Sequence, residues 1–523
     1  MGTVLASVSD KTGLADFAKR LKKAGFDFLA SGGTAEVLRN EGINVTEISE
    51  HISYPEILGG RVKTLHPIIY GGILARQTKK DLTEINELHI KAIDIVIVNL
   101  YPFEKTITNP AASEAECIEN IDIGGVSLLR AAAKNYERVT VICETCDYET
   151  AAYEIEKNGS VSLKTRMRFA LKAFDMCTGY DAAITLWMKN NIGAEETKMP
   201  EKLCTYVAGF AGRHLRYGEN PHQKALLYNT SPGADALGGT VLQGKELSYN
   251  NILDADAAWQ AVSLFTHPAA VVVKHLTPCG AAELNEETEL HTALEAAVAC
   301  DPVSAYGGIL AVNRTFDKNC FTAIENIFIE CIIAPHFAEN VKPLLAKKKN
   351  IRLIEAPLST LNKKYEFKSV LGGFLVQEKD SGEPAHTEYK NAAERKVDAA
   401  EEKLLRFAMK VCIAVKSNAI VLAAPIICGK TEKGCCTVGI GCGQPNRVDA
   451  ARQAIARAGE KAKDAVLASD AFFPFEDTVK VAAAAGISAI IQPGGSIRDG
   501  ASIAECNKNN MAMLITGVRH FKH

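Results

Sequence analysis

The feature of this chain that most constrains its fold is a repeated alternation of apolar, strand-length runs with amphipathic helical segments. Residues 3–9 (TVLASVS) form such a run, and apolar side chains then recur at helical spacing across residues 14–21. Residues 26–31 and 34–40 repeat the pattern, and residues 93–100 (IDIVIVNL) are apolar almost throughout, as in a strand buried in a parallel sheet. The first third of the chain is therefore predicted to be a doubly wound α/β domain.

A change of character near the middle of the chain predicts a domain boundary. Residues 189–202 lose periodicity, gain charge and contain Pro200, which is typical of a linker. We therefore expect two domains, residues 1–198 and residues 199–523. At about 150 residues per domain, a chain of 523 residues has room for about three domains or two large ones, so the second is expected to be of double size.

The second domain shows the same alternation and is also predicted to be α/β. Residues 388–412, rich in Ala, Glu and Lys, are expected to form a solvated amphipathic helix. The runs of strand character are residues 269–275, 307–313, 466–469, 488–495 and 512–517.

The composition excludes several classes of protein. With 59 Lys and Arg against 62 Asp and Glu, the chain has no overall basic field to hold nucleic acid or an anionic membrane. Fifteen scattered cysteines are an odd number in a long chain, which favours a reducing compartment over a disulfide framework. No leader is recognised, and no stretch reaches the about 18 consecutive apolar residues of a membrane span. We expect a cytoplasmic, soluble protein whose anionic ligands are held by local sites.

Two loops of the first domain follow predicted strands and open predicted helices. They are residues 9–13 (SDKTG) and 31–34 (SGGT). A helix N-terminus offers unpaired N–H groups and glycine lets a phosphate approach the backbone, so these loops suit a phosphate monoester in one shared crevice. The alternative, in which Ser and Thr are ordinary caps and Gly an ordinary turn residue, remains open. Neither loop has the spacing of a P-loop or a dinucleotide fingerprint.

Two further segments of the first domain carry polar groups toward the same region. Residues 59–67 (GGRVKTLHP) hold Arg61 and Lys63 close together, which favours an anionic ligand, although a solvated loop is the alternative. Asn99 and Tyr101 follow the apolar strand, where they would face the crevice or simply cap and pack the strand.

In the second domain, Lys274 and His275 stand where a buried strand ends. Burial would lower the pKa of the lysine and poise the histidine near neutrality, which suits proton transfer. A buried histidine satisfied by a carbonyl is the alternative. Pro278 and Cys279 match half of a zinc deaminase signature, but the second cysteine and the upstream HxE are missing, so we expect no zinc.

Fifteen motifs along essentially the whole chain resemble, in the same order, those of the bifunctional family that combines AICAR transformylase with IMP cyclohydrolase. The resemblance implies an N-terminal methylglyoxal-synthase-like domain and a larger C-terminal domain of two cytidine-deaminase-like α/β units. The motifs are SDKTGL, SGGTA, GGRVKTLHP, GGILAR, NLYPF, IDIGG, LLRAAAKN, LRYGENPHQ, KHLTPCG, CDPVSAYGG, IIAP, SVLGG, KSNAIV, GIGCGQPNRVDA and SDAFFPF.

The resemblance further implies the last two steps of purine synthesis. AICAR takes a formyl group from 10-formyltetrahydrofolate, and the product FAICAR closes to IMP with loss of water. In the second domain, His275 would accept the amine proton, Lys274 would stabilise the oxyanion or protonate the leaving folate, and Asn418 would position the formyl group. The implied substrate-binding residues there are Arg216, Tyr217, Tyr306, Gly307, Glu330, Arg519 and His523, with Phe472 and Phe473 near the folate.

For the first domain, the resemblance implies a cyclisation site of Lys63, Tyr101, Asp122 and Lys134, which would bind and stabilise a tetrahedral oxyanion. Which lysine does which task stays open. The implied phosphate and nucleotide cradle consists of Ser9, Lys11, Thr12, Gly13, Ser31, Gly32, Gly33, Thr34, Arg61 and Asn99.

The implied partners are small molecules (AICAR, FAICAR, IMP and folate) and a second copy of the chain, with transformylase sites at the interface of a homodimer. Some relatives bind potassium, which stays open here. Ile68, Tyr70 and Tyr306 depart from common family residues without removing an assigned group, and Glu330 stands where some members carry Asp. The alternatives are a chain that retains one activity and a nucleotide-sensing protein on the same folds.

Overall fold

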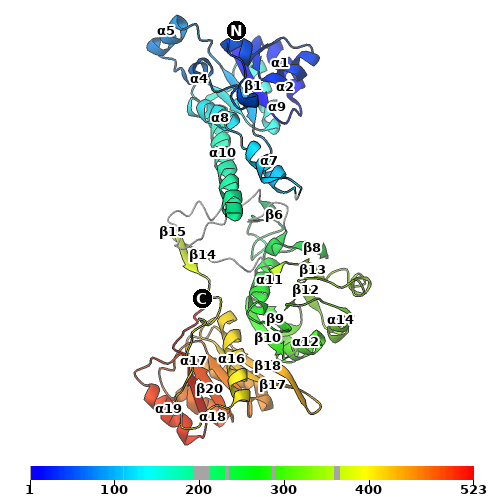
Figure 1. Ribbon diagram of the computed structural model, residues 1–523, viewed down its shortest axis with the longest axis vertical. Coiled ribbons are helices and arrows are strands. Elements are labelled where there is room, and N and C mark those ends of the chain that lie inside the picture. The colour runs from blue at the N-terminus through cyan, green and yellow to red at the C-terminus, as the bar shows by residue number, and fades with distance from the viewer. Residues whose placement is uncertain (1, 110, 193–211, 230–234, 286–288, 359–364) are drawn as a thin grey trace. The chain divides into compact units, whose positions relative to one another are not determined.

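The computed structural model describes residues 2–109, 111–192, 212–229, 235–285, 289–358 and 365–523. The chain divides into two units (Figure 1), and the described residues up to 192 belong to the first. The described residues from 212 onward belong to the second. The predicted boundary near residue 199 lies outside the described residues and stays a prediction.

A five-stranded parallel sheet organises the first unit, in the order β3-β2-β1-β4-β5. β1 therefore lies between β2 and β4, where the winding of the chain changes direction, and ligands bind at such switch points in open α/β sheets. The predicted doubly wound domain is confirmed. The strands are β1 (Gly2–Val8), β2 (Phe26–Ala30), β3 (Val45–Glu47), β4 (Ile95–Asn99) and β5 (Thr140–Ile142).

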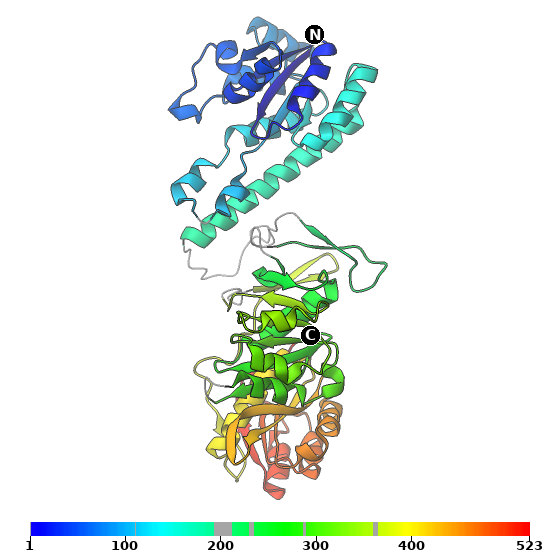
Figure 2. The ribbon, with the colours of Figure 1, turned by 90° about the vertical axis from the view of Figure 1, so that its right-hand side faces the viewer.

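Several helices cover this sheet with an apolar stripe, among them α1, α2, α8 and α10. α1 (Leu14–Lys23) buries Leu14, Phe17, Ala18 and Leu21, the face that the sequence predicts. α10 (Leu163–Ile192) is a 30-residue helix that Figure 2 shows in full. The other helices are α2 (Gly32–Asn40), α3 (Ile48–Ile52), α4 (Pro67–Leu74), α5 (Lys79–Glu87), α6 (Phe103–Ile107), α7 (Glu114–Glu119), α8 (Gly124–Lys134) and α9 (Tyr148–Asn158).

The second unit is built on a twelve-stranded mixed sheet, in the order β16-β21-β20-β19-β17-β18-β10-β9-β11-β12-β13-β8. Its strands are β8 (Thr240–Gln243), β9 (Ala269–Lys274), β10 (Thr277–Leu284), β11 (Gly308–Val312), β12 (Ile329–Ala334), β13 (Arg352–Glu355), β16 (Lys390–Asn391), β17 (Ile420–Cys428), β18 (Thr431–Gly441), β19 (Val466–Ser469), β20 (Ala489–Gln492) and β21 (Ala512–Ile515).

The two halves of this sheet repeat one arrangement. In each half an antiparallel pair, β9 with β10 or β17 with β18, is followed by three mutually parallel strands. β10 and β18 join the halves as antiparallel neighbours. The second domain is thus two like α/β halves, as predicted, while their cytidine-deaminase-like character stays a prediction.

The helices of the second unit are α11 (Tyr249–Val262), α12 (Leu290–Val298), α13 (Pro302–Ala305), α14 (Lys318–Ile324) and α15 (Lys342–Leu345) in the first half, and α16 (Ala399–Ala414), α17 (Arg447–Ala458), α18 (Asp477–Ala484) and α19 (Asp499–Lys508) in the second. Two small antiparallel sheets pair β6 (Arg213–Leu215) with β7 (Ala225–Leu227), and β14 (Tyr365–Val370) with β15 (Gly373–Glu378).

The prediction of a solvated helix over residues 388–412 is wrong. Residues 390–391 form β16, and the helix there, α16, buries nine side chains from Leu404 to Ala414, eight of them in a core that both halves share. The first half of α16 is rich in Ala, Glu and Lys, which is typical of an exposed helix. The segment that follows, LLRFAMKVCIA, is mostly apolar. In the described residues, no helix combines the length and the apolar character needed to cross a membrane.

Candidate active sites

Asn99 joins the two strand ends at the switch point of the first unit. Its Oδ1 accepts hydrogen bonds from the N–H of Ser9 (2.6 Å), the hydroxyl of Ser9 (2.9 Å) and the N–H of Asp10 (2.9 Å). Its Nδ2 donates to the carbonyl of Asp10 at 2.8 Å. The end of β4 therefore holds the loop after β1 in place.

The second predicted phosphate loop lies beside the first. The hydroxyls of Ser7 and Ser31 are 3.0 Å apart, and Thr34 Oγ1 accepts from the N–H of Val8 at 3.2 Å. Gly13 at the N-cap of α1 has no side chain, and Ser31 at the N-cap of α2 forms no capping hydrogen bond with its side chain. The N-termini of α1 and α2 thus open at one edge of the sheet without a side-chain cap, which suits an anion.

Lys63, Tyr101 and Asp122 form a polar cluster next to these loops. Lys63 Nζ donates to the Tyr101 hydroxyl at 3.4 Å, and the N–H of Gly125 donates to Asp122 Oδ1 at 2.7 Å. Burial raises the pKa of Asp122, although hydrogen bonds from the N–H groups of Gly125 and Tyr101 and the charge of Lys63 oppose the rise. The structure therefore brings together three of the four predicted cyclisation residues.

Glycine is required at the start of α8 for this cluster to form. A Cβ atom on Gly125 would lie 2.4 Å from Asp122 Oδ2, and one on Gly124 would lie 2.8 Å from Thr64 Oγ1. The IDIGG motif therefore brings the backbone against the carboxylate.

Two residues predicted for this site have other surroundings. Arg61 forms an exposed ion pair with Glu119 of α7. Lys134 is exposed at the last position of α8, ten residues after Gly124. At 1.5 Å per residue this is about 15 Å along the helix axis. The place of Lys134 in the cyclisation site stays a prediction.

In the second unit, Lys274 ends β9 and points to the start of β11. Its Nζ donates to the carbonyls of Gly307 (2.7 Å) and Tyr306 (3.2 Å). Gly307 has φ 67°, and a Cβ atom there would lie 3.0 Å from Lys274 Nζ. The positive φ favours glycine here, and a Cβ atom at this position would crowd the Lys274 ammonium group.

Asn418 is held by backbone contacts and is linked to the C-terminal segment through its neighbour. Its Nδ2 donates to the carbonyl of Gln444 at 2.8 Å. The hydroxyl of Ser417 donates to buried Asp470 and accepts from the N–H of Lys522 at 3.2 Å. This network connects Asn418 with the segment that carries Arg519 and His523.

Asp470 is the centre of that network. Its carboxylate forms a buried ion pair with Arg447 at 2.7 Å, and its carbonyl accepts from the N–H of His520 at 3.0 Å. Arg447 Nε in turn donates to the carbonyl of Phe472 at 3.2 Å. The aromatic segment, Asn418 and the C-terminal segment are therefore held as one assembly.

The aromatic segment is only partly as predicted. Phe472 is 38% exposed, but Phe473 is fully buried in the core, where its ring cannot reach a pterin. Phe475, which was not among the predicted residues, is 49% exposed, and the Arg498 guanidinium lies 4.7 Å from its ring centre. The repeated Phe residues of SDAFFPF gave no signal of which ring is exposed.

The remaining predicted residues lie on other elements of the second unit. The Arg216 guanidinium lies 5.4 Å from the Tyr217 ring in the loop after β6. Glu330 accepts from Asn251 Nδ2 at 2.8 Å and lies 3.6 Å from Arg352, so its carboxylate already has two partners. Tyr306 is 64% exposed, with its ring 5.4 Å from that of Phe328.

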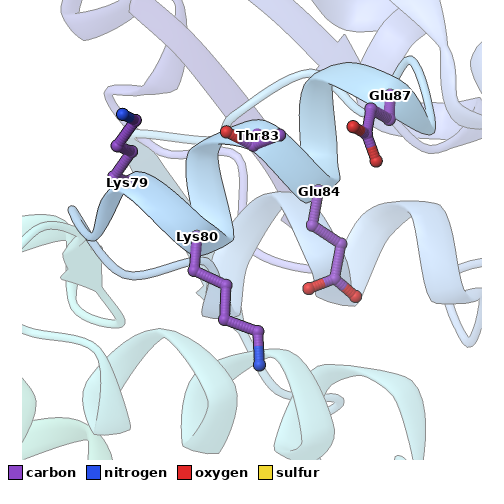
Figure 3. Close-up of a pocket in the computed structure, with 5 residues that line it drawn as sticks. All are labelled: Lys79, Lys80, Thr83, Glu84 and Glu87. Atoms are coloured by element: carbon purple, nitrogen blue, oxygen red, sulfur yellow. The ribbon is translucent and has the colours of Figure 1, made fainter.

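Two other features of the first unit lie outside these clusters. In the described part of the chain, one group of potential metal ligands comes together, Glu144, Cys146 and Asp147, but Lys172 Nζ lies 2.7 Å from both carboxylates and already supplies a cation. An open depression runs along α5 and contains none of the predicted site residues. It is lined by Lys79, Lys80, Thr83, Glu84 and Glu87 (Figure 3).

A doubly wound unit, with two helix N-termini that lack a side-chain cap, is followed by a double α/β unit in which Lys274 ends a strand of the central sheet, and this arrangement is typical of an enzyme of nucleotide chemistry. Comparison with known proteins supports this class. A family model described as the AICARFT/IMPCHase bienzyme matches residues 132–457, and one described as an MGS-like domain matches residues 13–127.

Curated relatives match along the full length. Proteins described as "Bifunctional purine biosynthesis protein PurH" are 49% identical in Halalkalibacterium halodurans, over 99% of both chains, and 48% identical in Listeria monocytogenes, over 100% of both. One from Trichodesmium erythraeum is 45% identical over 99% of both. The chain belongs to the AICARFT/IMPCHase bienzyme family. As a member, it is an AICAR formyltransferase and an IMP cyclohydrolase.

Proposed function

We propose that the two units divide these activities, with cyclisation of FAICAR in residues 1–198 and formyl transfer to AICAR in residues 199–523. The observation that carries the proposal is the presence of one polar cluster in each unit. Lys63, Tyr101 and Asp122 gather in the first, and Lys274 is fixed beside His275 in the second.

Formyl transfer requires a base and an electrophilic group. The AICAR amine attacks the formyl carbon of 10-formyltetrahydrofolate, its proton passes to His275, and the C–N bond to the folate breaks as that nitrogen regains a proton. Lys274 carries an ammonium group that stabilises the oxyanion or supplies the proton to the leaving nitrogen. Asn418 positions the formyl oxygen.

Ring closure is intramolecular, so orientation supplies much of the acceleration. The carboxamide nitrogen attacks the formyl carbon of FAICAR, and the resulting oxyanion is stabilised by Lys63 and the Tyr101 hydroxyl. Asp122 orients or deprotonates the amide. Loss of the oxygen as water then gives IMP.

Substrate binding is proposed for the residues that the family resemblance implies. In the first unit, the uncapped N-termini of α1 and α2 support a phosphate site, with Ser9 held by Asn99. In the second unit, Phe472 and its exposed neighbour Phe475 offer aromatic faces for the folate, and Phe473 is not proposed again.

The raised pKa of Asp122 predicts the acid limb of cyclisation. Because burial raises this pKa above the ordinary value of 3.8, Asp122 takes up a proton at a higher pH than an exposed aspartate. If the ionised carboxylate is the active form, the cyclisation rate is expected to fall as pH is lowered through the raised pKa. Rates measured with FAICAR should show this limb in the native enzyme and lose it in Asp122→Asn. A limb that persists in the variant belongs to another group.

We further propose a homodimer whose contacts include the hairpin of β14 and β15. Figure 1 shows this hairpin projecting from the second unit, and isolated two-stranded hairpins are marginally stable. Phe367, Leu371, Phe374 and Leu375 are exposed on it, which marks an interaction surface. Sedimentation should give twice the mass of one chain. The double variant Leu371→Asp, Phe374→Asp should shift the measured mass toward that of one chain. A native mass of one chain contradicts the proposal.

The cysteines support a reducing compartment, and we propose the cytoplasm. In the part of the chain that the structure describes, the cysteines are free thiols and most are buried. Burial raises the pKa of Cys279 and Cys300 to about 12, which makes both thiols unreactive. They act as packing residues.

The proposed formyl donor is 10-formyltetrahydrofolate, and no residue is assigned to potassium.

Assay of the purified protein with AICAR and 10-formyltetrahydrofolate tests the function as a whole. Tetrahydrofolate and IMP are expected together. Formation of tetrahydrofolate without IMP would contradict the cyclisation activity, and absence of turnover would favour a nucleotide-sensing protein on the same folds.

A further inference from the structure

The turn between β9 and β10 has a backbone that its sequence does not favour. His275 has φ 53° and Leu276 has φ 64°, and both are in the left-handed region where non-glycine residues are uncommon. Lys274 pairs with Thr277 across the turn, so these are the two central residues of a tight hairpin. Two-residue hairpins of this kind strongly prefer Asn-Gly or Gly-Gly, because both central residues need positive φ. Here His and Leu take those positions.

Asp254 of α11 holds this turn from outside the hairpin. Its Oδ2 accepts from the N–H of His275 at 3.1 Å, and its Oδ1 accepts from the N–H of Leu276 at 2.6 Å. Each carboxylate oxygen therefore binds one of the two strained residues. A charged acceptor that takes two backbone N–H groups forms stronger hydrogen bonds than a neutral one.

α11 is itself rigidly placed. Ser248 and Asn251 form a capping box at its start, and Ala255, Ala258 and Trp259 are buried against the sheet. Asn251 also donates to Glu330 at 2.8 Å, which joins α11 to β12. The carboxylate of Asp254 is therefore presented from a fixed element, as the support of a catalytic group requires.

We propose that Asp254 is a positioning residue for formyl transfer, which keeps His275 in its left-handed conformation and so fixes the direction in which its side chain leaves the turn after Lys274. The inference rests on the proposed role of His275. The strained turn persists because the Asp254 carboxylate accepts hydrogen bonds from both N–H groups, which point toward it when both residues have positive φ. In most such turns glycine makes positive φ favourable. Here the hydrogen bonds to Asp254 of α11 stabilise positive φ instead.

The test compares Asp254→Ala with the double variant Asp254→Ala, Leu276→Gly. Loss of the carboxylate is expected to lower kcat for formyl transfer by about 10- to 100-fold, because a displacement of about 1 Å can cost that much. KM for AICAR is expected to change little. Glycine adopts positive φ without strain, and Leu276 is 46% exposed, so the second change should restore a large part of the lost kcat. A merely structural role for Asp254 would not give rescue at the turn.

Matched controls separate the outcomes. Cyclisation of FAICAR by the same samples reports an intact first unit, thermal unfolding reports the second, and Glu295→Gln removes an exposed charge from α12. If Asp254→Ala unfolds the second unit, Asp254→Asn replaces it, since the amide keeps one acceptor oxygen and should fall between the native enzyme and the alanine variant.

Native kcat in folded Asp254→Ala, or no rescue by Leu276→Gly, would overturn the inference. His275→Ala distinguishes this from failure of the proposed function. If His275→Ala abolishes formyl transfer and Asp254→Ala does not, only the positioning role is wrong. If His275→Ala is fully active, the proposed function of His275 is itself wrong.

Discussion

Replacement of His275 by Ala is expected to lower the rate of formyl transfer by about 10²- to 10⁴-fold, the usual contribution of a positioned general base. The AICAR amine must lose a proton as it attacks the formyl carbon, and His275 is the group proposed to accept it. Cyclisation of added FAICAR should continue at the native rate, because the residues proposed for it lie in the other unit. Tetrahydrofolate release measures the first activity and IMP formation from FAICAR the second.

His267 offers a matched control for this experiment. It stands just before β9, whereas His275 follows the same strand, so the two histidines lie at opposite ends. His267 is exposed and lies 3.6 Å from Glu283. His267→Ala is expected to keep both activities, and loss of formyl transfer in this variant would show that the effect of His275→Ala reflects damage to β9. Loss of both activities in His275→Ala would argue against two separate sites.

Replacement of Lys63 by Ala is expected to lower the rate of FAICAR cyclisation by about 10²- to 10³-fold, the loss typical when a donor to a developing oxyanion is removed. Lys63 Nζ lies 3.4 Å from the Tyr101 hydroxyl, so its removal also leaves that hydroxyl without its cationic neighbour. Formyl transfer should persist, so FAICAR is expected to accumulate when AICAR and 10-formyltetrahydrofolate are supplied.

Lys134→Ala is the informative comparison, and Lys80→Ala on the exposed α5 is the neutral control. The structure places Lys134 at the far end of α8 from Asp122, so its replacement is expected to have the smaller effect. If Lys134→Ala loses as much cyclisation as Lys63→Ala, the site extends along α8 and both lysines serve the oxyanion. If Lys63→Ala cyclises FAICAR at the native rate, the proposed role of Lys63 is wrong.

Local sequence patterns were sufficient for much of the fold. Apolar runs and helical periodicity predict β1, β2, β4 and α1, because these elements bury a continuous apolar face. These patterns fail where the composition of a segment does not match its burial in the fold. β3 is three residues long and partly polar, and α16 begins with charged residues before it enters the core. Short or mixed segments carry too few apolar positions to show a period.

The collinear motifs determined the family, because each preserves residue types in an order that local structure alone does not require. They named Lys63, Tyr101, Asp122, Lys274, His275 and Asn418 as candidate chemical groups. They did not show which neighbouring side chains face a ligand. Phe472 is partly exposed while Phe473 is in the core, a difference that depends on how the chain turns after β19.

The sequence by itself thus determined the fold class, the family and the candidate chemical groups, all of which are written in short stretches of chain. Only the tertiary structure decided how those groups are held. Asn99 binds the Ser9 loop from 90 residues away, and Asp254 holds the turn at His275 and Leu276 from another element. The physical reason is that a hydrogen bond depends on distance and direction in space, which strand order and helix packing set, and these are not encoded in the spacing of residues along the chain.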